Sequence, residues 1–281
     1  MSKRTWGLWL LLSVVPAVAG AADDQWEVGS APSFSIGRYG TSARTEMLHT
    51  PIMARRLFGN GDVTFVFPFT CISGNGDVTI VDGTPVPTNP TGGRPGTERG
   101  RATPTPAPTP TPQPAVQTTD CGMGDLVLRG RYYLVDERGW MPTIALRGHV
   151  KAPTAKAERG LGTGKADVGV GVEVSRMLGG GFLAMVDGGY TVIGAPDDVD
   201  YDNNWWYDVG LGRDLAHGLL NLSVFFAEDR AIVPRYENAR DILTALTVKG
   251  ANGWRVQLSG QFGLSDGAPS HGIAVGASRR F

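Results

Sequence analysis

The chain ends in the stretch HGIAVGASRRF, which runs from His271 to Phe281. Because side chains alternate between the two faces of a β-strand, Ile273, Val275, Ala277 and Phe281 share one face. The opposite face carries small or polar residues. A strand with one apolar face, one small or polar face and an aromatic C-terminus fits the closing strand of an outer-membrane β-barrel. An ordinary half-buried strand is the alternative, so the rest of the chain decides between them.

The composition narrows the classes of protein. The chain has 281 residues and a formal net charge of -1 at pH 7. This charge gives no support to nucleic-acid binding, which usually shows as a surplus of basic residues. With 40 glycines and a charged fraction of 19%, the composition suits many strands and tight turns rather than a helical enzyme.

The N-terminus has the features of an export signal. Lys3 and Arg4 precede an apolar run from Trp6 to Val18, and small residues follow. This pattern predicts a signal peptide over residues 1–22, and an N-terminal membrane anchor is less favoured because the run is short. No other apolar run approaches the ~20 residues that a membrane helix needs. A mature chain that sits in a membrane must therefore do so as a closed barrel over residues 23–281, because unpaired backbone groups are not tolerated in lipid.

Alternating apolar and polar residues predict twelve antiparallel strands after a short polar lead at 23–30. The expected strands are 33–39, 43–58, 62–69, 126–134, 143–150, 167–175, 182–190, 205–212, 220–226, 242–248, 254–262 and 271–281. If Phe281 lies on the periplasmic side, the short turns fall on that side and most of the longer loops fall outside. An even strand number and this alternation of loop lengths are typical of bacterial outer-membrane barrels, and less so of a soluble all-β fold.

Aromatic residues agree with a membrane position, because they fall near both ends of the predicted strands. The periplasmic ends carry Tyr132, Trp140, Phe182, Trp254 and Phe281, and the outer ends carry Tyr190, Trp205, Tyr207 and Phe226. Two such girdles mark membrane–water interfaces. Arg279 falls on the apolar stripe, but close to the periplasmic interface, where an arginine can extend to the headgroups at a cost of about 0–1 kcal/mol.

Cys71 and Cys121 bracket the most unusual segment of the chain. An even number of cysteines in an exported protein predicts a disulfide between them. The Pro/Thr/Gly-rich sequence from Pro85 to Pro114 favours extended, solvated polyproline II, and Asp82-Gly83 could turn a small hairpin before it. The 71–121 segment is thus a loop insertion within the barrel. It either plugs the lumen or stays outside as a spacer, and the spacer is favoured because proline and threonine hydrate well and pack poorly.

Four stretches together resemble a known family: Phe65–Phe69, Cys121–Leu128, Pro142–Thr154 and Gly160–Gly164. In order, they are similar to an aliphatic run ending in proline and an aromatic residue, a Gly-x-Gly-Asp-Leu-x-Leu strand start, a strand leading into Lys-x-Pro-Thr, and a Gly-x-Gly before the next strand. The chain from about Phe34 to Phe281 resembles the outer-membrane transporters labelled as the MetA pathway of phenol degradation. The resemblance implies uptake of small compounds, with aromatic ones as a candidate class. The Cys-bracketed insertion and Arg279 depart from the family pattern.

The inward face of the predicted strands carries the candidate functional residues, which are charged and mixed in sign. They are Asp125, Arg129, Arg131, Arg147, His149, Asp167, Glu173, Asp187, Asp208 and Arg255. One interpretation is a polar pathway whose walls orient a small solute. The other is a salt-bridged interior that fills a narrow barrel and conducts nothing, and the pattern alone leaves both open.

Other chemistries find little support. No pair of the four histidines has metal-ligand spacing, and neither a metal nor a cofactor is expected. Gly160-x-Gly162-x-Gly164 lacks the remaining positions of a phosphate loop. Ser270-His271 suggests an outer-membrane lipid hydrolase, but neighbours on a strand point to opposite faces, so this is a minor alternative.

The sequence therefore predicts a non-enzymatic, twelve-stranded outer-membrane barrel that acts as a passive channel or facilitator for small molecules. Its expected partners are the lipid bilayer, a small-molecule solute and the barrel-assembly machinery, which would read the C-terminal strand. The main alternative is a non-conducting barrel whose surface loops, clipped by Cys71 and Cys121, serve binding or adhesion.

Overall fold

The fold was determined as a computed structural model, which describes residues 25–81, 83–88, 117–196 and 199–281. The predicted signal peptide, 1–22, lies outside these residues. The only helical elements in the described ranges are two short 3₁₀ turns, Ala157–Arg159 and Ala216–Gly218. No helix in this part of the chain is long and apolar enough to cross a membrane.

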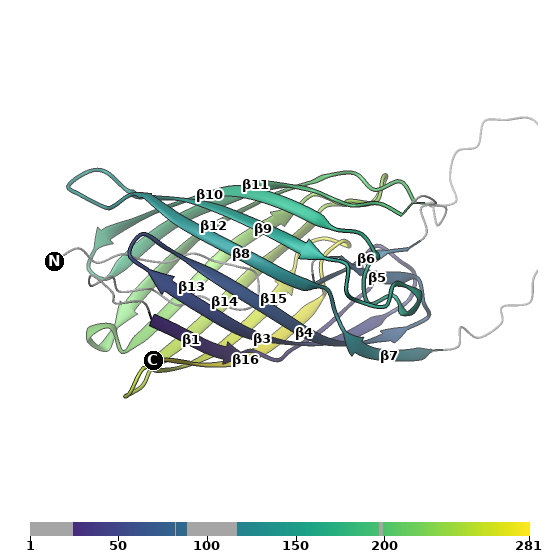
Figure 1. Cartoon of the computed structure of the whole chain (residues 1–281), viewed down its shortest axis with the longest axis horizontal. Helices are drawn as coiled ribbons and strands as arrows, with labels where there is room; N and C mark the ends of the chain where they lie inside the picture. The colour runs from purple at the N-terminus through teal and green to yellow at the C-terminus, as the bar shows by residue number, and fades with distance from the viewer. Residues whose placement is uncertain (1–24, 82, 89–116, 197–198) are drawn as a thin grey trace, which may run out of the picture.

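The chain forms a closed antiparallel barrel (Figure 1). In chain order, the strands are β1 (Gln25–Ser30), β2 (Ser33–Gly37), β3 (Thr45–Phe58), β4 (Gly61–Gly74), β5 (Val78–Val81), β6 (Thr84–Pro87), β7 (Thr118–Met123), β8 (Leu126–Val135), β9 (Thr143–Ala152), β10 (Asp167–Gly179), β11 (Phe182–Val192), β12 (Asn204–Leu215), β13 (Leu220–Asp229), β14 (Ala239–Lys249), β15 (Trp254–Gly263) and β16 (His271–Arg280). Closure comes from β16, which pairs with β15 on one side and with β1 and β2 on the other. The prediction of a twelve-stranded barrel is confirmed.

The first barrel strand consists of β1 and β2 together, which corrects the expectation that residues 23–30 are only a polar lead. Ser30 pairs with Ile52 and Ser33 with His49, so the register against β3 continues unchanged across the gap. The gap falls at Pro32, which has no N–H to donate to a ladder. The Pro32 carbonyl still accepts a hydrogen bond from the Val275 N–H at 3.1 Å, so the wall stays paired.

A second composite strand joins β7 to β8, and it lengthens the barrel wall beyond the prediction. The half of β4 nearer the long-loop end pairs with β7, and the half nearer the short-turn end pairs with β8. The register shifts by one residue at Gly124, whose N–H donates to the Pro68 carbonyl at 2.8 Å. Beyond this shift, β4 continues in a pairing with β7, so the sequence around Cys71 and Cys121 belongs to strands rather than to a loop.

The two faces of the wall have opposite polarity. On β10, Val170 is 65% exposed and Val168 50%, whereas Asp167 and Glu173, on the other face of the strand, are 0% and 1% exposed. Exposed valines and buried carboxylates reverse the usual arrangement of a soluble protein. The outward face is therefore the one that contacts lipid, and the inward face lines the lumen.

Connections at the two ends of the barrel differ in length, as predicted. At the end that holds Phe281, the strands are joined by short segments at 59–60, 136–142, 180–181, 216–219 and 250–253. At the other end, the connections are 38–44, 75–117, 153–166, 193–203, 230–238 and 264–270. Figure 1 shows the C-terminus at the end with the short turns, opposite β5, β6 and β7. The short-turn end is therefore periplasmic.

The lipid-facing role of the outward stripe can be measured with an arginine scan. Leu258 lies in the middle of β15 and is 49% exposed. We expect Leu258→Arg to lower the free energy of unfolding in lipid vesicles by about 2–4 kcal/mol, because the charge would lie near the bilayer midplane. Val192→Arg, at the outer end of β11, should cost only about 0–1 kcal/mol. Equal losses in a denaturant titration of the two variants would contradict the assigned bilayer position.

Candidate functional site

All of the predicted lumen residues lie on the inward face of the barrel. Most are buried, and Arg129 and Arg255 are half-buried. Further inward charges come from segments where the sequence pattern was weak or missed. Glu27 lies on β1, Arg55 on the proline-interrupted β3, and Asp62 at the start of β4. Whether these residues form a solute pathway stays a prediction.

Arg131 is the centre of a buried ion-pair network. Its guanidinium donates to Asp62 Oδ2 at 2.9 and 3.0 Å and to Glu173 Oε2 at 3.3 Å. Arg55 donates to the same Asp62 oxygen at 2.7 Å. The four side chains come from β3, β4, β8 and β10, so the network ties together one side of the wall. Such pairing is what makes buried charges tolerable.

The remaining charges are also grouped in pairs between strands. Arg147 of β9 pairs with Asp187 of β11. Lys151 Nζ lies 2.7 Å from Asp167 Oδ2 and 3.3 Å from Asp125 Oδ2. Near the periplasmic end, Glu27 holds Arg255 and Arg280, each at 3.3 Å. The predicted mixture of signs is thus ordered: basic residues dominate β8 and β9, and carboxylates line β10 to β14.

Carboxylates on β10 to β14 follow one register row around the wall. Glu173 pairs with Asp187, Asp187 with Asp208, Asp208 with Ala227, and Ala227 with Asp241. Asp241 accepts a hydrogen bond from Gln261 Nε2 at 3.1 Å. Asp208 is 4% exposed and has no hydrogen bond or ion pair within the described chain. Glu173 Oε1 and Asp241 Oδ1 also have no hydrogen bond in the described chain, so several acceptors along this row remain available.

Trp206 lies against the wall on two glycines of the neighbouring strands. In register, it pairs with Gly189, which in turn pairs with Gly171. A Cβ atom on Gly189 would lie 2.7 Å from Trp206 Cζ2, and one on Gly171 would lie 3.1 Å from it. Only glycine leaves space for the indole at such a close approach. The Arg147 guanidinium carbon lies 5.4 Å from the ring centroid, within cation–π range.

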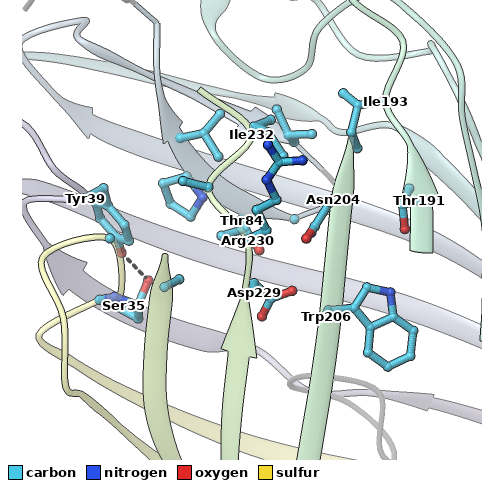
Figure 2. A pocket seen from close by; sticks show the side chains of 18 of the residues that line it. Ser35, Tyr39, Thr84, Thr191, Ile193, Asn204, Trp206, Asp229, Arg230 and Ile232 are labelled. Carbon is cyan, nitrogen blue, oxygen red and sulfur yellow. Dashed lines mark hydrogen bonds between the residues drawn. The ribbon is translucent and has the colours of Figure 1, made fainter. Parts of the chain in front are cut away.

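Trp206 and Asp208 face a cavity of about 190 Å³ in the outer half of the barrel (Figure 2). Much of its lining is apolar, and the polar groups converge from several strands and loops. The lining includes Ser35, Tyr39, Met47, His49, Pro51, Met53, Val66, Val81, Val86, Arg129, Arg147, Trp206, Asp208, Asp229, Ile232, Val233 and Tyr236. A concave, mostly apolar site with a few polar groups is typical of small-molecule binding. Sequence reasoning placed Trp206 on the inward stripe but did not single it out.

The hairpin of β5 and β6 closes this cavity from the outside. Val78, Ile80 and Val81 are buried. Val78 and Ile80 pack with Met47, Ile72 and Leu161, and the Ile80 N–H donates to the Gly160 carbonyl at 3.0 Å.

On its other side, Val81 of the hairpin packs with Ile193, Ile232 and Val233 of two outer loops. The favoured expectation that the insertion stays outside as a spacer is therefore wrong for residues 78–87. The reason is the Val-Thr-Ile-Val stretch, which has enough apolar surface to pack. Residues 89–116 lie outside the described residues.

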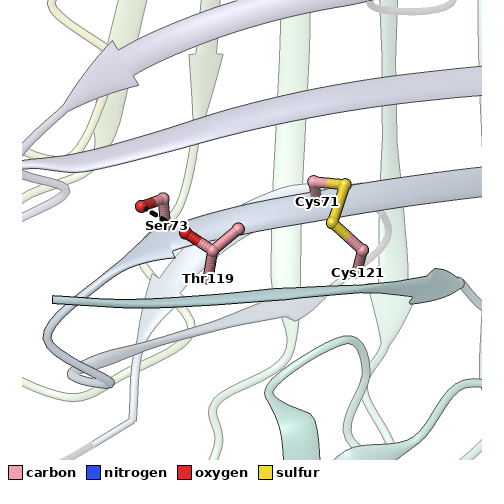
Figure 3. Close-up of a disulfide and its surroundings, with 4 residues drawn as sticks. All are labelled: Cys71, Ser73, Thr119 and Cys121. Carbon is pink, nitrogen blue, oxygen red and sulfur yellow. Dashed lines mark hydrogen bonds between the residues drawn. A yellow bond between two sulfur atoms is a disulfide. The ribbon is translucent and has the colours of Figure 1, made fainter.

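The predicted disulfide is present and holds the base of this insertion (Figure 3). Cys71 of β4 and Cys121 of β7 are directly opposed in register, with their Cα atoms 4.1 Å apart. Two register positions farther along β4, on the same face of the wall, Thr119 Oγ1 donates to Ser73 Oγ at 3.0 Å. The bond closes a sequence separation of 50 residues, so it limits how far the hairpin can move from the mouth.

Tyr39, in the outer connection 38–44, lies across the cavity from Thr191 and Ile193 (Figure 2). Its ring is 1% exposed, and its hydroxyl shares a 3.0 Å hydrogen bond with Ser35 Oγ. Burial raises the pKa of Tyr39 to about 12, so the phenol stays protonated at physiological pH. It is therefore a neutral hydrogen-bonding group in the cavity wall.

A smaller cavity of about 40 Å³ lies toward the periplasmic end. Its lining includes Glu27, Ser30, Arg55, Arg255 and Gln257, and it shares Met53 with the outer cavity. Met53 thus separates the two spaces. A methionine has a flexible, unbranched side chain that can change rotamer easily.

Other chemistries have little basis in the described chain. No group of three or more His, Cys, Asp or Glu side chains in it is arranged to hold a metal ion. His271 is exposed at the start of β16 and lies edge-on to Phe262, with 6.2 Å between the ring centroids. No hydrogen bond joins His271 to a serine or a carboxylate in the described residues, so the Ser270-His271 pair does not form a nucleophile–base arrangement.

Comparison with known proteins agrees with this architecture. Residues 74–281 match the family described as "Putative MetA-pathway of phenol degradation". The COG4313 outer membrane channel from Pseudomonas putida F1 has a TM-score of 0.64 and 12% identity, over 93% of this chain and 97% of that chain. The CymD monoaromatic hydrocarbon channel aligns with a TM-score of 0.44 and 8% identity, over 92% of this chain and 88% of its own. No curated protein sequence matches the chain.

At such low identity, the COG4313 channel indicates a shared fold, and the CymD alignment is too weak to add to it. The shared fold and the exposed apolar stripe together make this chain an outer-membrane β-barrel, as predicted.

The Arg131 network predicts a large stability effect for one substitution. Arg131→Gln would leave Asp62 and Glu173 without their main cation in a buried site. We expect a loss of about 3–5 kcal/mol in the free energy of unfolding, measured by denaturant titration in vesicles. Arg138→Gln, in the exposed periplasmic turn, is the matched control and should change stability by less than about 0.5 kcal/mol. A similar small effect for both would show that the network adds little.

Proposed function

Because the chain belongs to the family described by the MetA pathway of phenol degradation, we propose that it is a passive channel for small hydrophobic molecules, aromatic ones included. A solved structure of similar fold, the COG4313 protein, is an outer membrane channel. The observation that carries the proposal is the pair of lumenal cavities that meet at Met53. A solute would enter beside the β5–β6 hairpin, rest in the outer cavity and pass Met53 toward the periplasm.

The outer cavity offers such a solute three kinds of contact. Val81, Val86 and Ile232 supply apolar surface under the hairpin. The glycine-supported indole of Trp206 supplies a flat face for stacking. Asp208, which has no partner in the described chain, supplies a hydrogen-bonding group beside it. Aromatic stacking is directional, so this arrangement favours planar rings over other apolar solutes of the same size.

The position of Met53 predicts how flux responds to its size. Met53→Ala should raise single-channel conductance in planar bilayers and speed liposome swelling, because it widens the passage between the cavities. Met53→Trp should lower both. Met123→Ala, on the outward face of β7, is the control and should leave both unchanged. If the three variants behave alike, the route does not run past Met53.

Stacking on the Trp206 indole predicts a preference for aromatic over non-aromatic solutes. We expect Trp206→Ala to reduce the ratio of benzyl alcohol to cyclohexylmethanol flux into liposomes by about two- to tenfold, because an aromatic pair is worth about 0.5–1.5 kcal/mol beyond its buried area. Trp140→Ala removes a tryptophan that is 78% exposed at a periplasmic turn, and it should leave the ratio unchanged. An unchanged ratio for Trp206→Ala would remove the stacking face from the proposal.

A second candidate function is a non-conducting barrel that presents its outer loops to a binding partner. The packed hairpin and the ion pairs that fill the lumen favour it. Replacing residues 78–87 with a glycine–serine linker separates the two functions. Conductance that appears or increases supports a channel gated by the hairpin, whereas no conductance before or after the replacement supports the display function.

We also infer that β16 is the segment read by the barrel-assembly machinery. Its outward stripe of Ile273, Val275 and Ala277 leads to Phe281 at the chain end, and β16 is the strand that closes the barrel against β1 and β2.

A further inference from the structure

Arginines at the periplasmic rim stack on aromatic girdle residues in a repeated arrangement. The guanidinium carbon of Arg56 lies 5.4 Å from the Trp26 ring centroid, and that of Arg213 lies 4.7 Å from the Phe182 centroid. In register, Arg56 pairs with Trp26 and Arg213 with Phe182, so each stack joins two neighbouring strands.

The closing strand repeats the arrangement with two rings. Arg279 lies 4.9 Å from the Phe281 centroid and 5.8 Å from that of Trp254, its register partner on β15. The three stacks are distributed around the barrel, on β1–β3, β11–β12 and β15–β16. The exception on the apolar stripe, Arg279, is therefore one instance of a recurring feature.

All three arginines point outward, toward lipid, and lie within a few residues of the periplasmic strand ends. The charged residues at outward-facing positions of this end, in the described strands, are all arginines: Arg56, Arg176, Arg213 and Arg279. Among the described residues, the acidic side chains near this end either face the lumen, as Glu27 and Asp62 do, or lie in the turn at Asp136 and Glu137. The rim that contacts lipid is thus positively charged.

At the outer end of the barrel, two arginines lie beside carboxylates instead of aromatic rings. There Arg44 lies 3.3 Å from Glu46, and Arg240 lies 2.7 Å from Glu237. Arg213 and Arg279 have no carboxylate within ion-pair distance in the described chain. At these two positions of the periplasmic rim, the rings therefore orient the Arg213 and Arg279 guanidinium groups without neutralising them.

A stacked guanidinium keeps its N–H edge available. Its five donors lie in the plane of the group, so a ring that covers one face leaves them pointing outward, and their fork matches the oxygens of a phosphate. The phosphates of the periplasmic leaflet lie at this depth, next to the aromatic girdle. We propose that the stacked arginines Arg213 and Arg279 form binding sites for the headgroup phosphates of anionic glycerophospholipids.

The proposal can be tested by measuring which lipids accompany the protein. The full chain is folded into nanodiscs made of equal parts phosphatidylglycerol and phosphatidylcholine, then extracted mildly and analysed by native mass spectrometry. We expect phosphatidylglycerol to be enriched on the protein by about fivefold per site, because a basic residue near an anionic surface is worth about 1 kcal/mol. The variant R213Q/R279Q should lose most of this enrichment.

The matched control is R44Q/R240Q, which removes the same number of arginines from the outer end and should keep the enrichment. R213K/R279K retains the charge but not the planar fork, and we expect it to keep less than half of the enrichment.

Three results would overturn the proposal: equal enrichment in wild type and R213Q/R279Q, full enrichment in the lysine variant, or loss of bound lipid to added inorganic phosphate. The first would remove the lipid sites, the second would reduce them to point charges, and the third would assign them to a free anion. None of these measurements depends on conductance, so they stand apart from the channel proposal.

Discussion

Backbone hydrogen bonding in lipid is the constraint on which the rest of this structure depends. Every N–H and C=O within the bilayer needs a partner, so the first strand must meet the last. β16 therefore pairs with β1 and β2, and the wall is bridged at the breaks near Pro32 and Pro68. The carbonyl of Pro32 accepts from Val275 and that of Pro68 accepts from Gly124, so neither break opens the barrel. Prolines are tolerated here because their acceptors remain in use even though their donors are missing.

Closure also determines the chemistry of the lumen. Inward charges are enclosed by the closed wall, so they must find partners across the interior. Arg131 does so with Asp62 and Glu173, and Lys151 with Asp125 and Asp167. These pairs fill space and make the wall rigid. What remains open is the region around Trp206 and Asp208, where glycines replace side chains and a carboxylate has no partner in the described chain. The candidate site is thus the part of the lumen that the ion pairs leave unfilled.

The alternation of apolar and polar residues predicted most of the strands, because a period of two residues is a local property of the sequence. It correctly placed the predicted lumen residues inward and Phe281 at the periplasmic end. It missed Gln25–Ser30, where Pro32 shortens the pattern. The turn signal at Asp82-Gly83 indicated the hairpin, but not that its apolar residues pack against distant loops. The alternation also could not pair Arg131 with Asp62, which is 69 residues away. The indole of Trp206 rests on Gly189 and Gly171 of other strands, and only the register reveals such support.

Arginine side chains lie on both faces of the barrel wall, and the groups next to them determine what they do. Inside, carboxylates neutralise Arg55, Arg131 and Arg147, because a buried lone charge would be costly. Outside, at the periplasmic rim, no acidic side chain on the outward face of the described strands performs this task, and aromatic rings take the neighbouring positions. A ring attracts a guanidinium but leaves its charge in place. The counter-charge must then come from the solvent or the membrane, and the girdle position of Arg279 puts the membrane nearest. The residue that looked least suited to a lipid-facing strand is thus explained by the polar headgroups beside it.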